Sequence, residues 1–306
     1  MTHRHAPPDP VLTLHLFPEE RSALLDLLRS LTDDDWARPT VCPGWSVKDI
    51  AAHLLGDDVG CLSRGRDGYP GAAFTPSSPQ PSPDTFAAEL LDFINRQNEL
   101  WVAAARRLSP RTLIDLLDWT AVQTHAYFES LDLFATGGPV TWSGPRPAPV
   151  WLDIAREYTE RWLHQAQVRD ALGAPLLREP RLFAPVLDTF VRALPHTFRD
   201  IPAPDDTTVA LTISGPAGGQ WSLIHAAATL SRQAGERALA QSGRVRAWQL
   251  FRGVSEKPAA AVTMDTDVAW RLFTKGIAKA EAIARSTLSG DPALAARVFD
   301  AVSIIA

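Results

Sequence analysis

The sequence predicts a two-domain protein: an N-terminal all-α four-helix bundle over residues 11–178, followed by a small α+β domain over residues 180–306. Three observations lead to this prediction. The chain has 306 residues, which is more than one hydrophobic core usually organises. Up to about residue 175, apolar residues recur at helical spacing and no convincing strand is found. Beyond residue 180, short alternating β-branched segments replace that pattern.

The predicted bundle is a series of long helices joined by long loops. Ser46 is expected to cap the second helix, with Asp49 as its capping-box partner. Gly173, followed by Pro175, is expected to end the last one. The connections are rich in proline, glycine and serine. The predicted helical segments cover residues 17–31, 46–64, 86–108, 111–135 and 151–173. One of these five segments is expected to be an extra helix beside the four of the bundle.

The second domain is predicted from strand-like runs that alternate or are rich in β-branched residues. The GPAGG run at 215–219 lacks the strand–GxGxxG–helix context of a dinucleotide site, so we interpret it as a hairpin turn. Helices are expected at 181–194, 268–276 and 293–302. The predicted strands cover residues 207–214, 220–228, 245–251 and 259–265.

Composition argues against several classes of protein. The net charge is −5 with no lysine- and arginine-rich block, so nucleic-acid binding is not expected. No stretch approaches the roughly 18 uncharged apolar residues of a membrane span, and residues 1–10 lack the apolar core of a signal peptide. The two cysteines, Cys42 and Cys61, are too few for a secreted disulfide scaffold, so the expected location is a reducing cytoplasm.

Glu160 and His164 are the first candidate site residues, because positions four apart lie on one face of a helix. Carboxylate oxygens and imidazole nitrogens are typical ligands of zinc and similar divalent metals. On pattern alone, a surface interaction is the commoner explanation of such a pair. The helical wheel does not decide between the two interpretations.

His53 is the natural third ligand, at the edge of the apolar face that contains Ile50 and Leu54. The competing interpretation is a half-buried histidine that hydrogen-bonds Asp57 or Asp49. His125 is also a candidate to lie close to the metal ligands without binding the metal itself. The other histidines lie near the N-terminus or in the second domain: His3, His5, His15, His196 and His225.

Two segments resemble signatures of a known family, the DinB-like, maleylpyruvate-isomerase-type thiol-dependent metalloenzymes. They are WARPTVCPGWSVKDIAAHLLG at 36–56 and EYTERWLHQAQVRDALGAP at 157–175. The resemblance implies that the family's metal ligands fall on His53, Glu160 and His164. It also implies a four-helix bundle followed by an α+β domain that is similar to sterol-carrier proteins.

The resemblance further implies chemistry with a low-molecular-weight thiol and an electrophilic substrate. The best-known member isomerises maleylpyruvate with mycothiol, and related members are thought to be S-transferases that use mycothiol or bacillithiol. Zinc is the first expectation for the metal, with nickel or another divalent ion as alternatives, in a monomer or homodimer. Three protein ligands leave a coordination position open, where a thiol would lose its proton readily.

Two other functions stay open from the sequence. A metal-dependent hydrolase on the same bundle would use bound water and need no thiol. A non-catalytic protein would hold the metal for stability while the second domain binds a ligand.

Three arginines of the second domain are candidates to bind an anionic substrate, and the sequence does not decide among Arg246, Arg252 and Arg271. Cys42 is interpreted as a small buried thiol in preference to a nucleophile.

Overall fold

The computed structural model describes residues 6–72, 74–78, 80, 83–227 and 246–304. The ends of two predicted strands, residues 228 and 245, lie outside this set, as do His3 and His5. The described chain forms two compact units. The helical unit comprises 12–136 and 149–177. The sheet unit comprises 6–11, 137–148 and 178–304.

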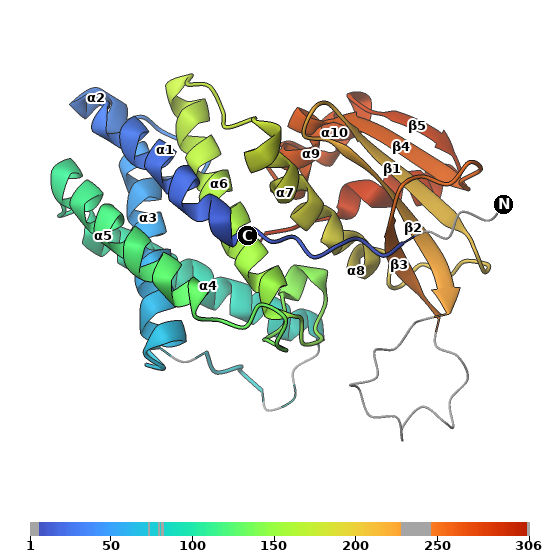
Figure 1. Cartoon of the computed structure of the whole chain (residues 1–306), viewed down its shortest axis with the longest axis horizontal. Helices are drawn as coiled ribbons and strands as arrows, with labels where there is room; N and C mark the ends of the chain where they lie inside the picture. Colours follow the sequence, from blue (N-terminus) through green and yellow to red (C-terminus); the bar gives the residue numbers. More distant parts are fainter. Residues whose placement is uncertain (1–5, 73, 79, 81–82, 228–245, 305–306) are drawn as a thin grey trace. The chain divides into compact units, whose positions relative to one another are not determined.

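The helical unit is built from helices that pack side by side (Figure 1). Helix α3 packs against α4, α5 and α6, and α1 packs against α5 and α6. A π-helical turn, Cys61–Arg66, continues α3. The helices are α1 (Phe17–Arg29), α2 (Asp33–Trp36), α3 (Val47–Gly60), α4 (Pro83–Ala105), α5 (Pro110–Glu129) and α6 (Val150–Leu172).

Several boundaries differ from the sequence prediction, and two of the differences have a local cause. The predicted loop after the first helix contains α2, whose N-terminus has a capping box between Thr32 and Asp35. Four residues are too few to show periodicity, so the pattern missed this helix. Helix α5 ends at Glu129 instead of near 135, because Ser130 turns its hydroxyl back to the Tyr127 carbonyl.

The predicted caps of α3 and α6 are confirmed. The Asp49 carboxylate accepts hydrogen bonds from the Ser46 backbone N–H at 3.0 Å, and the Ser46 hydroxyl accepts one from the Asp49 backbone N–H at 3.3 Å. At the other cap, Gly173 adopts φ +67°, a left-handed conformation that favours glycine. These caps fix where the two helices that carry the candidate site begin and end.

Replacing Ser46 by alanine is expected to lower the free energy of unfolding by about 1 kcal/mol, because it removes the cap of α3. Urea unfolding followed by circular dichroism measures this change. Ser22→Ala is the matched control, since Ser22 is an exposed residue inside α1. Equal stabilities of the two variants would contradict the capping role.

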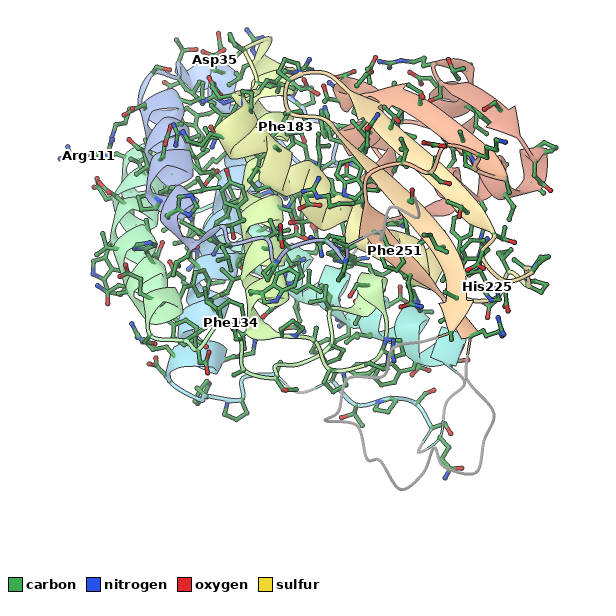
Figure 2. The ribbon with its side chains drawn as sticks, turned by 45° about the vertical axis from the view of Figure 1, so that its right-hand side comes forward. Asp35, Arg111, Phe134, Phe183, His225 and Phe251 are labelled. Atoms are coloured by element: carbon green, nitrogen blue, oxygen red, sulfur yellow. The ribbon has the colours of Figure 1, made fainter. Side chains whose placement is uncertain are left out.

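The core of the helical unit lies where α1, α3, α5 and α6 meet, and side chains fill the space between the ribbons (Figure 2). Its members are apolar side chains at helical spacing, and Ile50 and Leu54 among them were expected on an apolar face from the sequence. They include Leu24, Leu28, Ile50, Leu54, Leu113, Leu117 and Val168. This packing brings α3 and α6 into contact and thereby places their polar side chains close together.

The sheet unit contains a five-stranded mixed sheet of order β3-β2-β1-β4-β5. β1 pairs in parallel with β4, and the other neighbouring pairs are antiparallel. The predicted turn at 215–219 joins β1 to β2. A Cβ on Gly218 would lie 1.9 Å from the Ile213 carbonyl oxygen, so this turn requires glycine. The strands are β1 (Thr208–Ser214), β2 (Gly219–Ala227), β3 (Arg246–Arg252), β4 (Ala260–Asp265) and β5 (Thr287–Gly290).

The four predicted strands are confirmed as β1–β4, and β5 was missed because it is short and mostly exposed. Helix α8 packs against β3, α9 against β1 and β4, and α11 against β4 and β5. Phe183 of α7, labelled in Figure 2, is fully buried. The helices are α7 (Pro180–Phe190), α8 (Leu194–Thr197), α9 (Thr266–Phe273), α10 (Lys279–Ala284) and α11 (Pro292–Arg297).

The predicted order of a helical region followed by a mixed α and β region is therefore confirmed. Among the described residues, none of the helices combines the length and apolar character needed to cross a bilayer.

Candidate functional site

The three predicted metal ligands lie together where α3 packs against α6. Nε2 of His53, on α3, is 3.1 Å from Nε2 of His164, on α6. Oε2 of Glu160 is 3.7 Å from His164 Nε2. The two histidines are 7% and 8% exposed, so the cluster is largely shielded from water.

Asp57 is a fourth member that the sequence interpretation did not include as a ligand. It lies one turn after His53 on α3, and its Oδ2 is 3.4 Å from His53 Nε2. The sequence interpretation named Asp57 only as a partner that would satisfy a structural histidine. Each helix therefore contributes one carboxylate and one imidazole at i, i+4 spacing, and the two imidazoles meet between the helices.

Buried ion pairs beside the cluster set the rotation of both helices. The Asp58 carboxylate accepts hydrogen bonds from Arg21 of α1 at 2.8 Å and from Arg161 of α6 at 2.8 Å. Asp58 follows Asp57, and Arg161 follows Glu160. Neighbouring positions on a helix point about 100° apart. The ion pair between Asp58 and Arg161 therefore also fixes the directions in which the Asp57 and Glu160 side chains point.

Burial determines the charge of the cluster. It lowers the pKa of both His53 and His164 to about 4, so both imidazoles are neutral at pH 7. Burial also raises the pKa of Asp57 to about 6 and that of Glu160 to about 7, although Arg156 opposes the shift at Glu160. Two neutral imidazoles and two carboxylates with raised pKa values, Glu160 at 17% and Asp57 at 30% side-chain exposure, make a site that a cation would stabilise.

The donor set fits a divalent metal in chemistry, and approximately in spacing. Donor atoms that share a tetrahedral zinc ion lie roughly 3.3–3.4 Å apart. The spacing within the cluster is 3.1 to 3.7 Å. Within the described residues, no three His, Cys, Asp or Glu side chains are already arranged around a common metal position.

Two residues outside this set contact it. Oε1 of Gln167, one turn after His164 on α6, lies 2.8 Å from His164 Nδ1. The Trp45 ring lies with its centroid 5.1 Å from that of His53. Gln167 was recognisable from the sequence only as sharing a helical stripe with Glu160 and His164, and nothing in the sequence signalled the contact of Trp45.

The structure places the other candidate residues elsewhere. Nε2 of His125 lies 3.2 Å from the Leu14 carbonyl oxygen and its Nδ1 lies 3.8 Å from Glu129, so these polar contacts of His125 do not involve the cluster. The three candidate arginines each pair with an aspartate of the sheet unit, so none has a guanidinium without an acidic partner. The pairs are Arg246–Asp205, Arg252–Asp188 and Arg271–Asp267.

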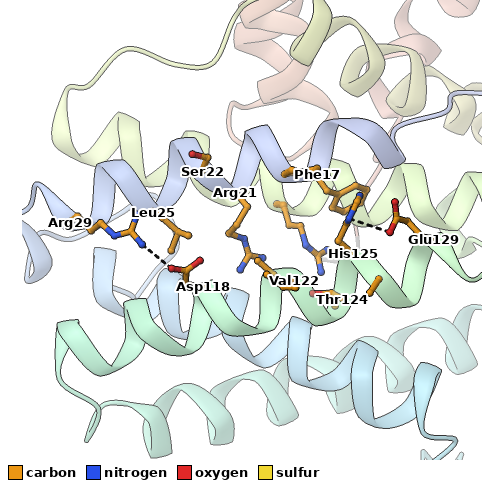
Figure 3. Close-up of a pocket in the computed structure, with 14 residues that line it drawn as sticks. Phe17, Arg21, Ser22, Leu25, Arg29, Asp118, Val122, Thr124, His125 and Glu129 are labelled. Carbon is orange, nitrogen blue, oxygen red and sulfur yellow. Dashed lines mark hydrogen bonds and ion pairs between the residues drawn. The ribbon is translucent and has the colours of Figure 1, made fainter.

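A cavity of about 430 Å³ lies between α1 and α5 (Figure 3). Its floor includes the buried Arg21 and Arg161, and an Arg29–Asp118 ion pair lies at its rim. None of the cluster residues lines it. The cavity and the cluster are thus separate features of the helical unit, and the cluster holds the groups suited to metal chemistry.

Comparisons with known proteins bear on the same region. Residues 17–169, half of the chain, match the model of the family described as the mycothiol maleylpyruvate isomerase N-terminal domain. Two uncharacterized proteins of Mycobacterium tuberculosis, from strains CDC 1551 / Oshkosh and ATCC 25618 / H37Rv, are each 27% identical over 199 residues. Each alignment covers 64% of this chain and 70% of the relative.

Two solved structures are also similar. One is the crystal structure of the mycothiol-dependent maleylpyruvate isomerase, at 11% identity and a TM-score of 0.47. The alignment covers 85% of this chain and 86% of that chain. The other is a histidine-to-alanine mutant of that isomerase, at 12% identity and a TM-score of 0.46 over the same shares. The family match includes α3 and most of α6, the two helices that form the cluster. The chain therefore belongs to the family defined by the mycothiol maleylpyruvate isomerase N-terminal domain.

Proposed function

We propose that this chain is a metal-dependent enzyme that uses a low-molecular-weight thiol, with His53, Glu160 and His164 as the metal ligands. The observation that carries the proposal is the 3.1 Å approach of the two Nε2 atoms, from separate helices, beside Glu160. Family membership supports the thiol, mycothiol or bacillithiol. The reaction is isomerisation of a maleylpyruvate-like substrate or S-transfer to an electrophile.

The residues of the cluster have distinct roles in this proposal. Neutral imidazoles at His53 and His164 offer lone pairs, while the Glu160 carboxylate offsets part of the charge of a divalent ion. The bound ion, zinc in the first instance, would make a thiol easier to deprotonate. Shielding of the cluster from water strengthens these electrostatic interactions.

In the isomerisation, the thiol sulfur adds to the double bond of the substrate and converts it to a single bond. Rotation about that bond and elimination of the thiol give the other isomer, so no thiol is consumed. In S-transfer, the sulfur either adds to a double bond, with a proton taken up at the neighbouring carbon, or displaces a leaving group, and it stays attached to the electrophile. The proposal also includes the finer features of the family: a DinB-like four-helix bundle and a second domain similar to sterol-carrier proteins.

The test combines elemental analysis of the full-length protein with a thiol panel. We expect stoichiometric zinc or a similar metal, and turnover of maleylpyruvate or a model electrophile only when mycothiol or bacillithiol is added. Turnover of a hydrolysable substrate without thiol would favour a hydrolase. Bound metal without turnover or thiol binding would favour a non-catalytic role, and absence of any metal would overturn the proposal.

A further inference from the structure

Gln167 connects the cluster to the loop that precedes α3. Its Oε1 lies 2.8 Å from Nδ1 of His164 and 3.4 Å from Sγ of Cys42. Gln167 is only 9% exposed, so little water competes for this oxygen. One buried amide oxygen thus receives two side-chain donors, one from α6 and one from the loop.

An amide oxygen accepts hydrogen bonds and cannot donate them. His164 must therefore carry its proton on Nδ1, which leaves the lone pair of the neutral ring on Nε2. Nε2 is the atom that lies 3.1 Å from His53 and 3.7 Å from Glu160. The contact with Gln167 consequently directs the lone pair of His164 into the cluster.

Cys42 determines which end of the amide faces His164. A thiol is a weak donor, and here it shares the oxygen that His164 uses. Rotating the amide by half a turn would point its NH₂ group at Sγ and Nδ1, and the S–H group would then lose the oxygen that accepts its hydrogen bond. The Cys42 backbone N–H donates to the Thr40 hydroxyl at 3.2 Å, which anchors the loop that presents the thiol.

We propose that Gln167, oriented by Cys42, is a positioning residue that holds His164 as its Nδ1–H tautomer, so that Nε2 is ready to bind a divalent cation. The identity of the bound group rests on the proposed function. The tautomer itself is a property of the metal-free chain, so it can be tested separately.

The first measurement is ¹⁵N NMR of the histidine rings in metal-free full-length protein at neutral pH. We expect His164 to be protonated on Nδ1. His125 is an internal reference of the opposite kind, because its Nε2 faces the Leu14 carbonyl. Gln167→Leu removes the acceptor and should give His164 a mixture of tautomers without changing His125. Gln167→Glu keeps an acceptor and should preserve the wild-type tautomer.

The second measurement is zinc affinity by competition with a chelator. Gln167→Leu should weaken binding by about 10- to 100-fold, as loss of an outer partner of a metal histidine does, and Gln167→Glu should restore it. A wild-type His164 protonated on Nε2, or a leucine variant with unchanged tautomer and affinity, would overturn the inference. If wild-type protein has the expected tautomer of His164 but binds no zinc, the role of Gln167 in setting the tautomer is supported. The proposed metal-dependent function is then overturned.

Discussion

Replacing His53 or His164 by alanine is expected to abolish stoichiometric metal binding and thiol-dependent turnover together. His53 and His164 are two of the three proposed ligands, and their Nε2 atoms are 3.1 Å apart. Removal of either ring therefore leaves only two of the proposed ligands. The loss should exceed the roughly 10- to 100-fold that follows loss of an outer partner. Chelator competition measures the affinity, and the thiol-panel assay measures the turnover.

His125→Ala is the matched control for these variants. His125 lies on α5 in the same helical unit, but it bonds the Leu14 backbone and does not contact the cluster. Its alanine variant should keep the wild-type metal content and turnover. Full metal content in both cluster variants would show that His53 and His164 are a structural pair, and the assignment of ligands would then be wrong.

Replacing Asp58 by asparagine is expected to lower the free energy of unfolding by about 3–5 kcal/mol. The substitution removes one charge from a buried network and leaves Arg21 and Arg161 without the carboxylate that they share. The Asp58 side chain is 0% exposed, so water cannot replace the lost contacts. Thermal or urea unfolding at pH 7 measures the effect.

Asp118→Asn is the matched control, because Asp118 also pairs with an arginine of α1. That pair is exposed, with Arg29 at 48% and Asp118 at 55%, and its loss should change stability by less than about 1 kcal/mol. Similar losses in the two variants would show that burial of the Asp58 network adds nothing.

The effect of the Asp58 substitution should depend on pH. Burial alone would raise the pKa of Asp58, but Arg21 and Arg161 outweigh burial and hold this pKa below its usual range. A lowered folded-state pKa stabilises the fold above the unfolded pKa of about 3.9, and this contribution is lost as pH falls through the folded value. The stability difference between wild type and Asp58→Asn should therefore be full at pH 7 and shrink in acid. A difference that did not change with pH would contradict the assigned charge.

Periodicity predicted the helices of the site better than it predicted the direction of their side chains. Helix α6 is buried over nearly its whole circumference between Ala155 and Val168. An amphipathic pattern requires one face in water, and α6 has little such face. The helical wheel could not show that Glu160 and His164 point toward α3, and family resemblance supplied that expectation instead.

The partners of the cluster required the fold. Asp57 and Gln167 are ordinary polar residues in the sequence, and their roles follow from the side of each helix that faces the other. That rotation is set by Asp58 and Arg161, which are 103 residues apart. Cys42 reaches Gln167 across 125 residues, so no local pattern could reveal the contact.

The sequence by itself determined the order of the longer helices and of β1–β4, the caps of α3 and α6, and the i, i+4 spacing of Glu160 and His164. These features depend on residues a few positions apart, which interact through the backbone of one element. Only the tertiary structure decided that His53 meets His164, that burial keeps both rings neutral, and that candidate arginines of the sheet unit are already paired. Those properties arise from desolvation and packing between distant segments, which local sequence does not encode.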